Sequence, residues 1–319
     1  MNGPNGAILI QEVSPRDGLQ IEPKWIETAD KVHLIDALSL AGFSRIEAGS
    51  FVAAKAVPGL RDGADVFAAI KRRPSTVYVA LVPNRRGAER AVAARADEVN
   101  FVMSASETHN LANMRMSPAE SLSGLGDIVA LAHESGITVN ATVATAFGCP
   151  FEGKQPDVKI LGLVRRYLDH GVDGVTLADT TGMANPDQVA RLVSAALSQV
   201  PTDRLTLHFH NTRGLGLVNV LAAYQSGARR FDASLGGLGG CPFAPGATGN
   251  VCTEDLINLC HETGIETGLD LSALITLSRD LPKLVGHEVP GQIAKAGRTT
   301  DLHPAPIGRR PTNTGGPGY

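Results

Sequence analysis

The chain has 319 residues, of which 43% are hydrophobic and 19% charged, and its formal net charge is −3. Lysine and arginine form no dense block or stripe, which argues against nucleic acid or an anionic membrane as a partner. No apolar run approaches the roughly 20 residues of a membrane span, and the first residues lack the features of a signal peptide. The four cysteines have no CxxC spacing and are expected to be reduced. We therefore expect a cytoplasmic protein that acts on a small molecule.

Short β-branched runs alternate with longer amphipathic runs along the chain. The first strand is predicted at residues 7–13, and a helix follows it with Thr28 as the candidate N-cap and Gly42 as the stop signal. Seven further strands are predicted at residues 43–48, 76–82, 98–103, 137–143, 174–178, 205–210 and 230–235. Helical patterns separate them, and Pro118, Pro156 and Pro186 each suit a first helical turn.

Eight β/α units without a break in composition favour an α/β fold, the (β/α)₈ or TIM barrel, with an open doubly wound sheet as the alternative. We expect the barrel to form a catalytic domain over residues 1–285. A further helix is predicted near residues 270–281, so the barrel would carry a C-terminal helical extension. Residues 286–319 are expected to form a C-terminal extension and mobile tail, because the stretch HPAPIGRRPTNTGGPGY is rich in proline and glycine.

Polar residues gather where the predicted strands end, which is where barrel enzymes place their active sites. The candidate residues are Arg16, Asp17 and Gln20 after the first strand, Glu47 and Ser50 at the second, Thr176 and Asp179 at the sixth, and His208 and His210 at the seventh. The loop after the eighth strand is rich in glycine but contains no nucleotide fingerprint such as GxGxxG. A flexible loop that closes over a ligand is therefore favoured over a phosphate cradle.

The stretch LHFHNTRG places two histidines on one side of the seventh strand, because side chains alternate with period two. Neutral imidazoles at this spacing are natural ligands of one cation. Asp17 could offer a carboxylate oxygen from across the barrel, and Asn250 an amide oxygen. A lone HxH pair is more often structural, but its combination with the first-strand RDG and the last loop favours a metal site.

Several motifs occur together in the order EVSPRDGLQ, IEAGSFV, GCPFEGK, LADTTG, HFHNT and GLGGCPFAPGATGNVCTEDL. With them the chain resembles the hydroxymethylglutaryl-CoA lyase family of divalent-metal TIM-barrel lyases, from about residue 8 to residue 270. The resemblance implies cleavage of 3-hydroxy-3-methylglutaryl-CoA to acetyl-CoA and acetoacetate by a homodimer. It also implies roles for particular residues: Asp17, His208, His210 and Asn250 as ligands of Mg²⁺ or Mn²⁺, Arg16 as support of the substrate carbonyl, and Cys241 on a mobile active-site loop.

The reaction explains why such residues would be needed. Negative charge develops on the hydroxyl oxygen and on the thioester oxygen, so a cation and Arg16 can stabilise the two centres. Glu47 either orients Arg16 or forms an ordinary salt bridge. Asp17, His208 and a bound water are all candidates for the base, and Cys241 is the candidate proton donor to the enolate. Cys252 and Cys260, eight residues apart on a predicted helix, are expected to share a face and pack as small apolar residues. Cys149 lies in a GCP stretch that suggests either the rim of the active site or structural packing, and packing is favoured.

Two positions depart from the best-known pattern of the resembled family, because Asn211 and Arg213 stand where an aspartate and a tyrosine are expected. Either the loop is a packing variant, or Arg213 binds the carboxylate of a different acyl-CoA such as citramalyl-CoA. An isopropylmalate or homocitrate synthase type of acyltransferase fits less well, since the chain reads DGLQ rather than DGEQ and is too short for the usual extra region. A barrel kept only for binding is disfavoured because all candidate ligands and Cys241 are present.

Overall fold

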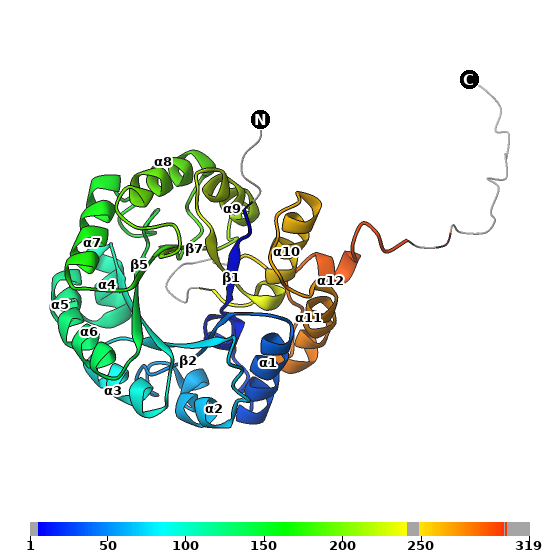
Figure 1. Ribbon diagram of the computed structural model, residues 1–319, viewed down its shortest axis with the longest axis horizontal. Helices are drawn as coiled ribbons and strands as arrows, with labels where there is room; N and C mark the ends of the chain where they lie inside the picture. Colours follow the sequence, from blue (N-terminus) through cyan, green and yellow to red (C-terminus); the bar gives the residue numbers. More distant parts are fainter. Residues whose placement is uncertain (1–5, 241–248, 303, 305–319) are drawn as a thin grey trace, which may run out of the picture.

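A computed structural model describes residues 6–240, 249–302 and 304 of the chain (Figure 1). Its eight strands form a closed parallel barrel in sequence order, in which β1 pairs with both β2 and β8. The barrel predicted from the sequence is confirmed, and the open doubly wound sheet is excluded by the β1–β8 pairing. The strands are β1 Leu9–Glu12, β2 Arg45–Ser50, β3 Val77–Val82, β4 Glu98–Ser104, β5 Thr138–Ala144, β6 Gly174–Asp179, β7 Leu205–Phe209 and β8 Arg230–Ala233.

Helices surround the strands on the outside of the barrel (Figure 1). They are α1 Thr28–Leu40, α2 Gly63–Ala69, α3 Arg85–Ala93, α4 Glu107–Met114, α5 Pro118–Ser123, α6 Leu125–Glu134, α7 Asp157–Asp169, α8 Pro186–Leu197, α9 Gly216–Gln225, α10 Thr253–Glu262, α11 Leu271–Val285 and α12 Ile293–Ala296. A π-helix η1 spans Ser14–Gly18, and two short 3₁₀ helices span Pro58–Leu60 (η2) and Leu235–Gly237 (η3). The π-helix follows β1 directly, and such turns occur frequently at functional sites.

The interior of the barrel holds a chain of polar side chains, whereas branched aliphatic residues are usual there. Asn100 on β4 donates to Glu47 on β2 (3.0 Å), and Asn140 on β5 donates to both Asn100 (3.0 Å) and Thr176 on β6 (2.9 Å). Alternate residues such as Leu177 are fully buried on the outward face of the strands, where the helices pack. The apolar core therefore lies between strands and helices, and the space inside the barrel is left for polar groups.

Two local predictions about helices differ from the structure. Thr28 is the first residue of α1 rather than its N-cap, because Glu27 occupies that position and the Thr28 hydroxyl donates to Asp62 (2.7 Å). The helical pattern that begins at Pro118 forms two helices, α5 and α6, which meet at Gly124. A tertiary hydrogen bond thus replaces the expected capping role of Thr28, and a glycine interrupts the helical pattern at residue 124.

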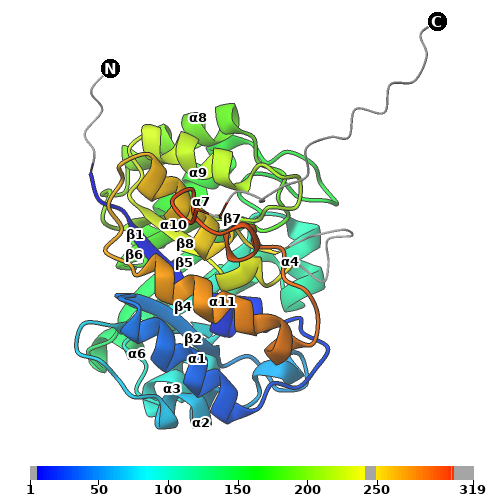
Figure 2. The ribbon, with the colours of Figure 1, turned by 90° about the vertical axis from the view of Figure 1, so that its right-hand side faces the viewer.

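Helices follow the barrel at its C-terminal end, as expected. Figure 2 shows α11 beside α10 and α1 on one side of the barrel. The segment after α11 packs on these helices, because Val289 and Ala294 are buried and the Asp255 carboxylate accepts the backbone amides of Gln292 and Ile293. Across the described segments, no helix combines the length and the apolar character that a membrane crossing requires.

Candidate metal centre

Three side chains from opposite ends of the sequence meet at the C-terminal mouth of the barrel. Asp17 lies in η1, His208 lies in β7 and His210 follows that strand. One potential ligand atom from each lies within 4.8 Å of the other two, and all three residues are buried. The imidazole centroids are 5.1 Å apart, and His210 Nε2 lies 3.8 Å from Asp17 Oδ2. The structure therefore brings together the three residues that the sequence pattern selected.

Asn250 completes this group as the fourth candidate ligand. An isolated β-bridge pairs its backbone with His210, and its amide nitrogen donates to Asp17 Oδ2 (2.7 Å) and to the Leu238 carbonyl (3.0 Å). These two bonds use the amide hydrogens and leave the carbonyl oxygen Oδ1, which is buried and has no hydrogen-bond partner among the described residues. A buried amide oxygen without a partner is costly, and a hard cation would satisfy it.

The charge of the site also fits a divalent cation. Arg16 donates to Asp17 Oδ1 (2.6 Å) and to Glu47 Oε2 (2.6 Å), and Asp232 lies close enough to interact electrostatically with its guanidinium. Three buried carboxyl groups thus surround one arginine. Burial opposes ionisation of Asp17, yet Arg16 and the two histidines hold the pKa of this carboxyl at about 2. The Asp17 carboxyl group is accordingly ionised at neutral pH, as a carboxylate ligand of a divalent cation must be.

Asp232 on β8 is a site residue that sequence reasoning missed. Its Oδ2 lies 3.1 Å from His208 Nδ1, and the register of β7 and β8 pairs these two residues directly. This contact fixes the imidazole ring and leaves Nε2 for a ligand, the arrangement found around many metal-bound histidines. The sequence does contain a signal that could have identified Asp232, because an acidic residue inside the eighth strand is unusual and the seventh strand carries the two histidines.

The other predicted residues lie around this cluster. Glu47 forms a buried ion pair with Arg16, which both alternatives for this residue predicted, and Thr176 belongs to the polar chain inside the barrel. Asp179 accepts the backbone amides of Met183 (2.8 Å) and Ala184 (3.1 Å), and burial raises the pKa of its carboxyl to about 6. Ser50 is buried at the end of β2, where its hydroxyl accepts the amide of Val52 (3.3 Å).

The remaining predicted positions are less closely tied to the cluster. Gln20 is half-buried just beyond η1. Arg213 is exposed, and its Nη1 donates to the carbonyls of Thr181 (3.1 Å) and Gly182 (2.8 Å) in the loop after β6. Cys241 lies outside the described residues. Cys149, Cys252 and Cys260 are buried as expected, although Cys252 is the N-cap of α10 and does not lie inside that helix.

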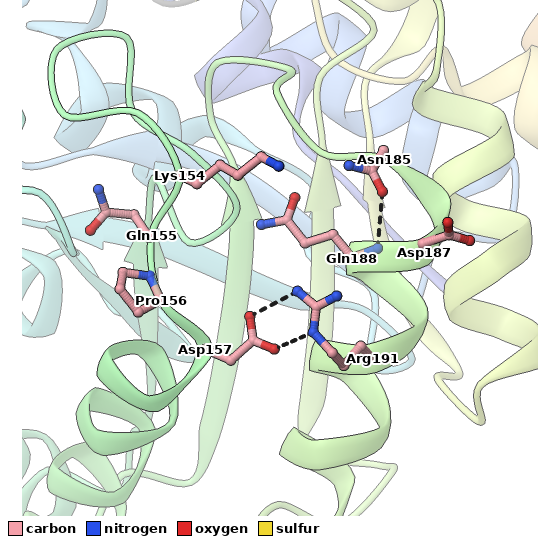
Figure 3. A pocket seen from close by; sticks show the side chains of 8 residues that line it. All are labelled: Lys154, Gln155, Pro156, Asp157, Asn185, Asp187, Gln188 and Arg191. Carbon is pink, nitrogen blue, oxygen red and sulfur yellow. Dashed lines mark hydrogen bonds and ion pairs between the residues drawn. The ribbon is translucent and has the colours of Figure 1, made fainter.

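A separate cavity of about 510 Å³ lies between the N-terminal ends of α7 and α8 (Figure 3). Asp157 and Arg191 form an ion pair on its wall (2.6 Å), and Lys154 and Gln188 also face it. None of the four candidate ligands lines this cavity, so the candidate metal centre lies elsewhere.

A closed (β/α)₈ barrel with two histidines and an aspartate clustered at its mouth defines a TIM-barrel protein with a candidate metal centre. The HMGL-like family matches residues 7–281 of the chain, and the chain belongs to this family of carbon–carbon lyases.

Individual relatives agree with this assignment. The structure of an HMG-CoA lyase from Acinetobacter baumannii in complex with coenzyme A and 3-methylmalate is 62% identical, with a TM-score of 0.93 over 96% of this chain and 100% of that one. The hydroxymethylglutaryl-CoA lyase of Bacillus subtilis is 42% identical over 89% of this chain and 95% of its own. The (R)-citramalyl-CoA lyase of Chloroflexus aurantiacus is 43% identical over 91% and 95%.

Replacing Gly239 with alanine should disrupt the candidate metal centre. A Cβ atom there would lie 2.6 Å from Asn250 Nδ2 and 3.1 Å from the Asp17 carbonyl oxygen, at a φ of +106°. We expect Gly239→Ala to weaken Mn²⁺ binding at least about tenfold, measured by titration of metal-free protein. Gly264→Ala is the control, because that glycine also has a positive φ (+72°) but a Cβ there meets nothing within 4 Å. Equal affinities in the two variants would contradict the placement of Asn250 in the site.

Proposed function

We propose that this protein cleaves 3-hydroxy-3-methylglutaryl-CoA to acetyl-CoA and acetoacetate, with Mg²⁺ or Mn²⁺ bound by Asp17, His208, His210 and Asn250. The observation that carries the proposal is the buried cluster of these residues beside Arg16. The relatives named as hydroxymethylglutaryl-CoA lyases support the choice of substrate. When bound, the cation would act as a Lewis acid toward the substrate oxygens.

The reaction breaks the bond between the carbinol carbon and the α-carbon of the thioester. The carbinol hydroxyl loses its proton and becomes the ketone of acetoacetate, while the electron pair of the broken bond forms the enolate of acetyl-CoA. Arg16 is held by Glu47 and Asp17 and can stabilise the thioester oxygen as it gains charge, in the manner of an oxyanion hole. Asp17, His208 and a bound water remain the candidates for the base that takes the hydroxyl proton.

The enolate must then receive a proton on carbon. Cys241 is the candidate donor, since a thiol is the readily titratable group in the glycine-rich stretch between Leu235 and Asn250. Gln20, Ser50, Thr176 and Asp179 are proposed to bind substrate from the surrounding strand ends. We also propose a homodimer, as the family resemblance implies, and a cytoplasmic location, as expected from the sequence.

A second substrate, citramalyl-CoA, is favoured by one feature of the chain. Arg213 presents an exposed guanidinium in the loop after β7, where its Nη1 donates to two backbone carbonyls, and a guanidinium binds carboxylates bidentately. The 43% identical relative acts on (R)-citramalyl-CoA according to its name. An acyltransferase of the isopropylmalate or homocitrate synthase type has no comparable support.

Turnover with 3-hydroxy-3-methylglutaryl-CoA tests the proposal directly. We expect acetoacetate and acetyl-CoA in equal amounts, activity near background after exhaustive chelation, and recovery when Mg²⁺ or Mn²⁺ is added back. His210→Ala should also lower the bound metal, measured by elemental analysis. Full turnover by the chelated protein, or unchanged metal content in His210→Ala, would show that the site assignment is wrong.

Cys241→Ser tests the proton donor. The hydroxyl is a far weaker acid than the thiol, so we expect kcat to fall by about 10²-fold or more while Mn²⁺ affinity stays unchanged. The measurement pairs steady-state kinetics with a metal titration of the same preparation. Unimpaired turnover by Cys241→Ser would show that Cys241 is not the proton donor.

Arg213→Tyr tests substrate selection. If Arg213 binds the substrate carboxylate, the exchange should lower kcat/KM for citramalyl-CoA by about tenfold or more relative to 3-hydroxy-3-methylglutaryl-CoA, because that carboxylate would lose its bidentate, charged partner. Both thioesters are compared in the parent and the variant. A parent that strongly prefers 3-hydroxy-3-methylglutaryl-CoA, with no change in preference on substitution, would exclude a selective role for Arg213.

A further inference from the structure

Glu12, the last residue of β1, is a completely buried carboxyl group to which no role has been given above. Its Oε1 accepts the backbone amides of Ser14 (2.8 Å) and Leu235 (3.0 Å), and its Oε2 accepts the hydroxyl of Thr253 (2.7 Å). Within residues 6–240 and 249–302, no lysine or arginine forms an ion pair with it. Glu12 is therefore bound by hydrogen bonds to three separate segments and not by a counter-charge.

Each of these three segments leads to an oxygen ligand of the candidate metal centre. Ser14 begins η1, which carries Asp17. Leu235 begins η3, which leads to the Leu238 carbonyl that accepts from the Asn250 side chain. Thr253 lies three residues after Asn250. One carboxyl group thus connects the supports of both oxygen ligands, while the two histidines are supported separately by β7.

The segment at η3 is held from its other side as well. The next amide along the chain, that of Gly236, donates to Oε2 of Glu254 (3.0 Å), which is also buried. Backbone hydrogen bonds join the same segment to the residues after Asn250, because the Ser234 amide donates to the Val251 carbonyl and the Thr253 amide donates to the Ser234 carbonyl (both 3.0 Å). The position of Asn250 relative to Asp17 therefore depends on how this segment sits against Glu12.

An ionised carboxyl group at this position costs free energy of folding, because burial disfavours the charged form and raises the pKa of Glu12 to about 7. An apolar side chain would avoid that cost but would leave two amides and a hydroxyl without a buried acceptor. The three hydrogen bonds therefore favour a side chain that accepts in fixed directions. The function of Glu12 is geometric rather than electrostatic.

We propose that Glu12 is a positioning residue for the metal centre, which sets Asp17 and Asn250 at the separation that a single cation requires. The inference rests on the proposed function, because it takes these residues as metal ligands. Glu12 does not touch the ligands themselves through any hydrogen bond that the structure shows, so it acts through the backbone segments that carry them.

The test measures Mn²⁺ binding to metal-free protein by electron paramagnetic resonance, together with the thermal unfolding midpoint. Glu12→Ala should weaken Mn²⁺ binding at least about tenfold, the size of effect typical of residues that orient ligands. Glu12→Gln should bind within about threefold of the parent, because its carbonyl can accept both amides and Thr253 can reverse its hydroxyl to accept from the new amide group.

Glu98→Ala provides the matched control. Glu98 is a buried glutamate at the start of β4, at the other end of the strands from the candidate ligands, and it accepts hydrogen bonds from Arg45 and Thr138. It should lower the unfolding midpoint and leave Mn²⁺ affinity unchanged. If Glu12→Ala does not fold, Thr253→Val removes one of the three bonds and should weaken binding about threefold to tenfold.

The possible outcomes separate the two hypotheses. A parent protein that binds no Mn²⁺ would overturn the proposed metal centre itself. If the parent binds Mn²⁺ and a folded Glu12→Ala or Thr253→Val variant binds it with equal affinity, only the role of Glu12 is overturned. Equal losses in Glu12→Gln and Glu12→Ala would show that charge rather than hydrogen-bond geometry matters, and would also overturn it.

Discussion

Closure of the barrel between β1 and β8 is the constraint on which the candidate site depends. Four registered residue pairs join these two strands, from Leu9 with Arg230 to Glu12 with Ala233. Because parallel strands all end at the same rim, this pairing brings the residues that follow β1 next to those that follow β8. There the side-chain amide nitrogen of Asn250 donates a hydrogen bond to Asp17 Oδ2, although the two candidate ligands come from opposite ends of the sequence.

Much of the architecture could be predicted because its signals are local. Each strand is a short β-branched run between amphipathic segments, so all eight were located to within a few residues. The candidate ligands could be selected for a related reason, since His208 and His210 lie on one face of their strand regardless of which strands pair with it. Asp17 followed from its place just after the first strand. These inferences required only strand periodicity and the rule that barrel strands carry chemistry at one end.

Other features depend on contacts between distant segments and had no local signal. Asp232 is one acid within a strand, and its importance comes from the register that pairs it with His208. Glu12 is similar, because its three donors come from η1, η3 and α10, which only the closed barrel brings together. Thr28 was misplaced for the same reason: its hydroxyl binds Asp62 across an interface, where a local capping bond was expected.

The polar chain inside the barrel has a consequence for how this interior can change during evolution. Asn100 donates to Glu47 and accepts from Asn140, which in turn donates to Thr176, so each amide satisfies its neighbours on both sides. Replacing one member with an apolar residue leaves at least one buried neighbour without its partner. Substitutions at these positions are therefore coupled, and related sequences should exchange them in compatible sets more often than one at a time.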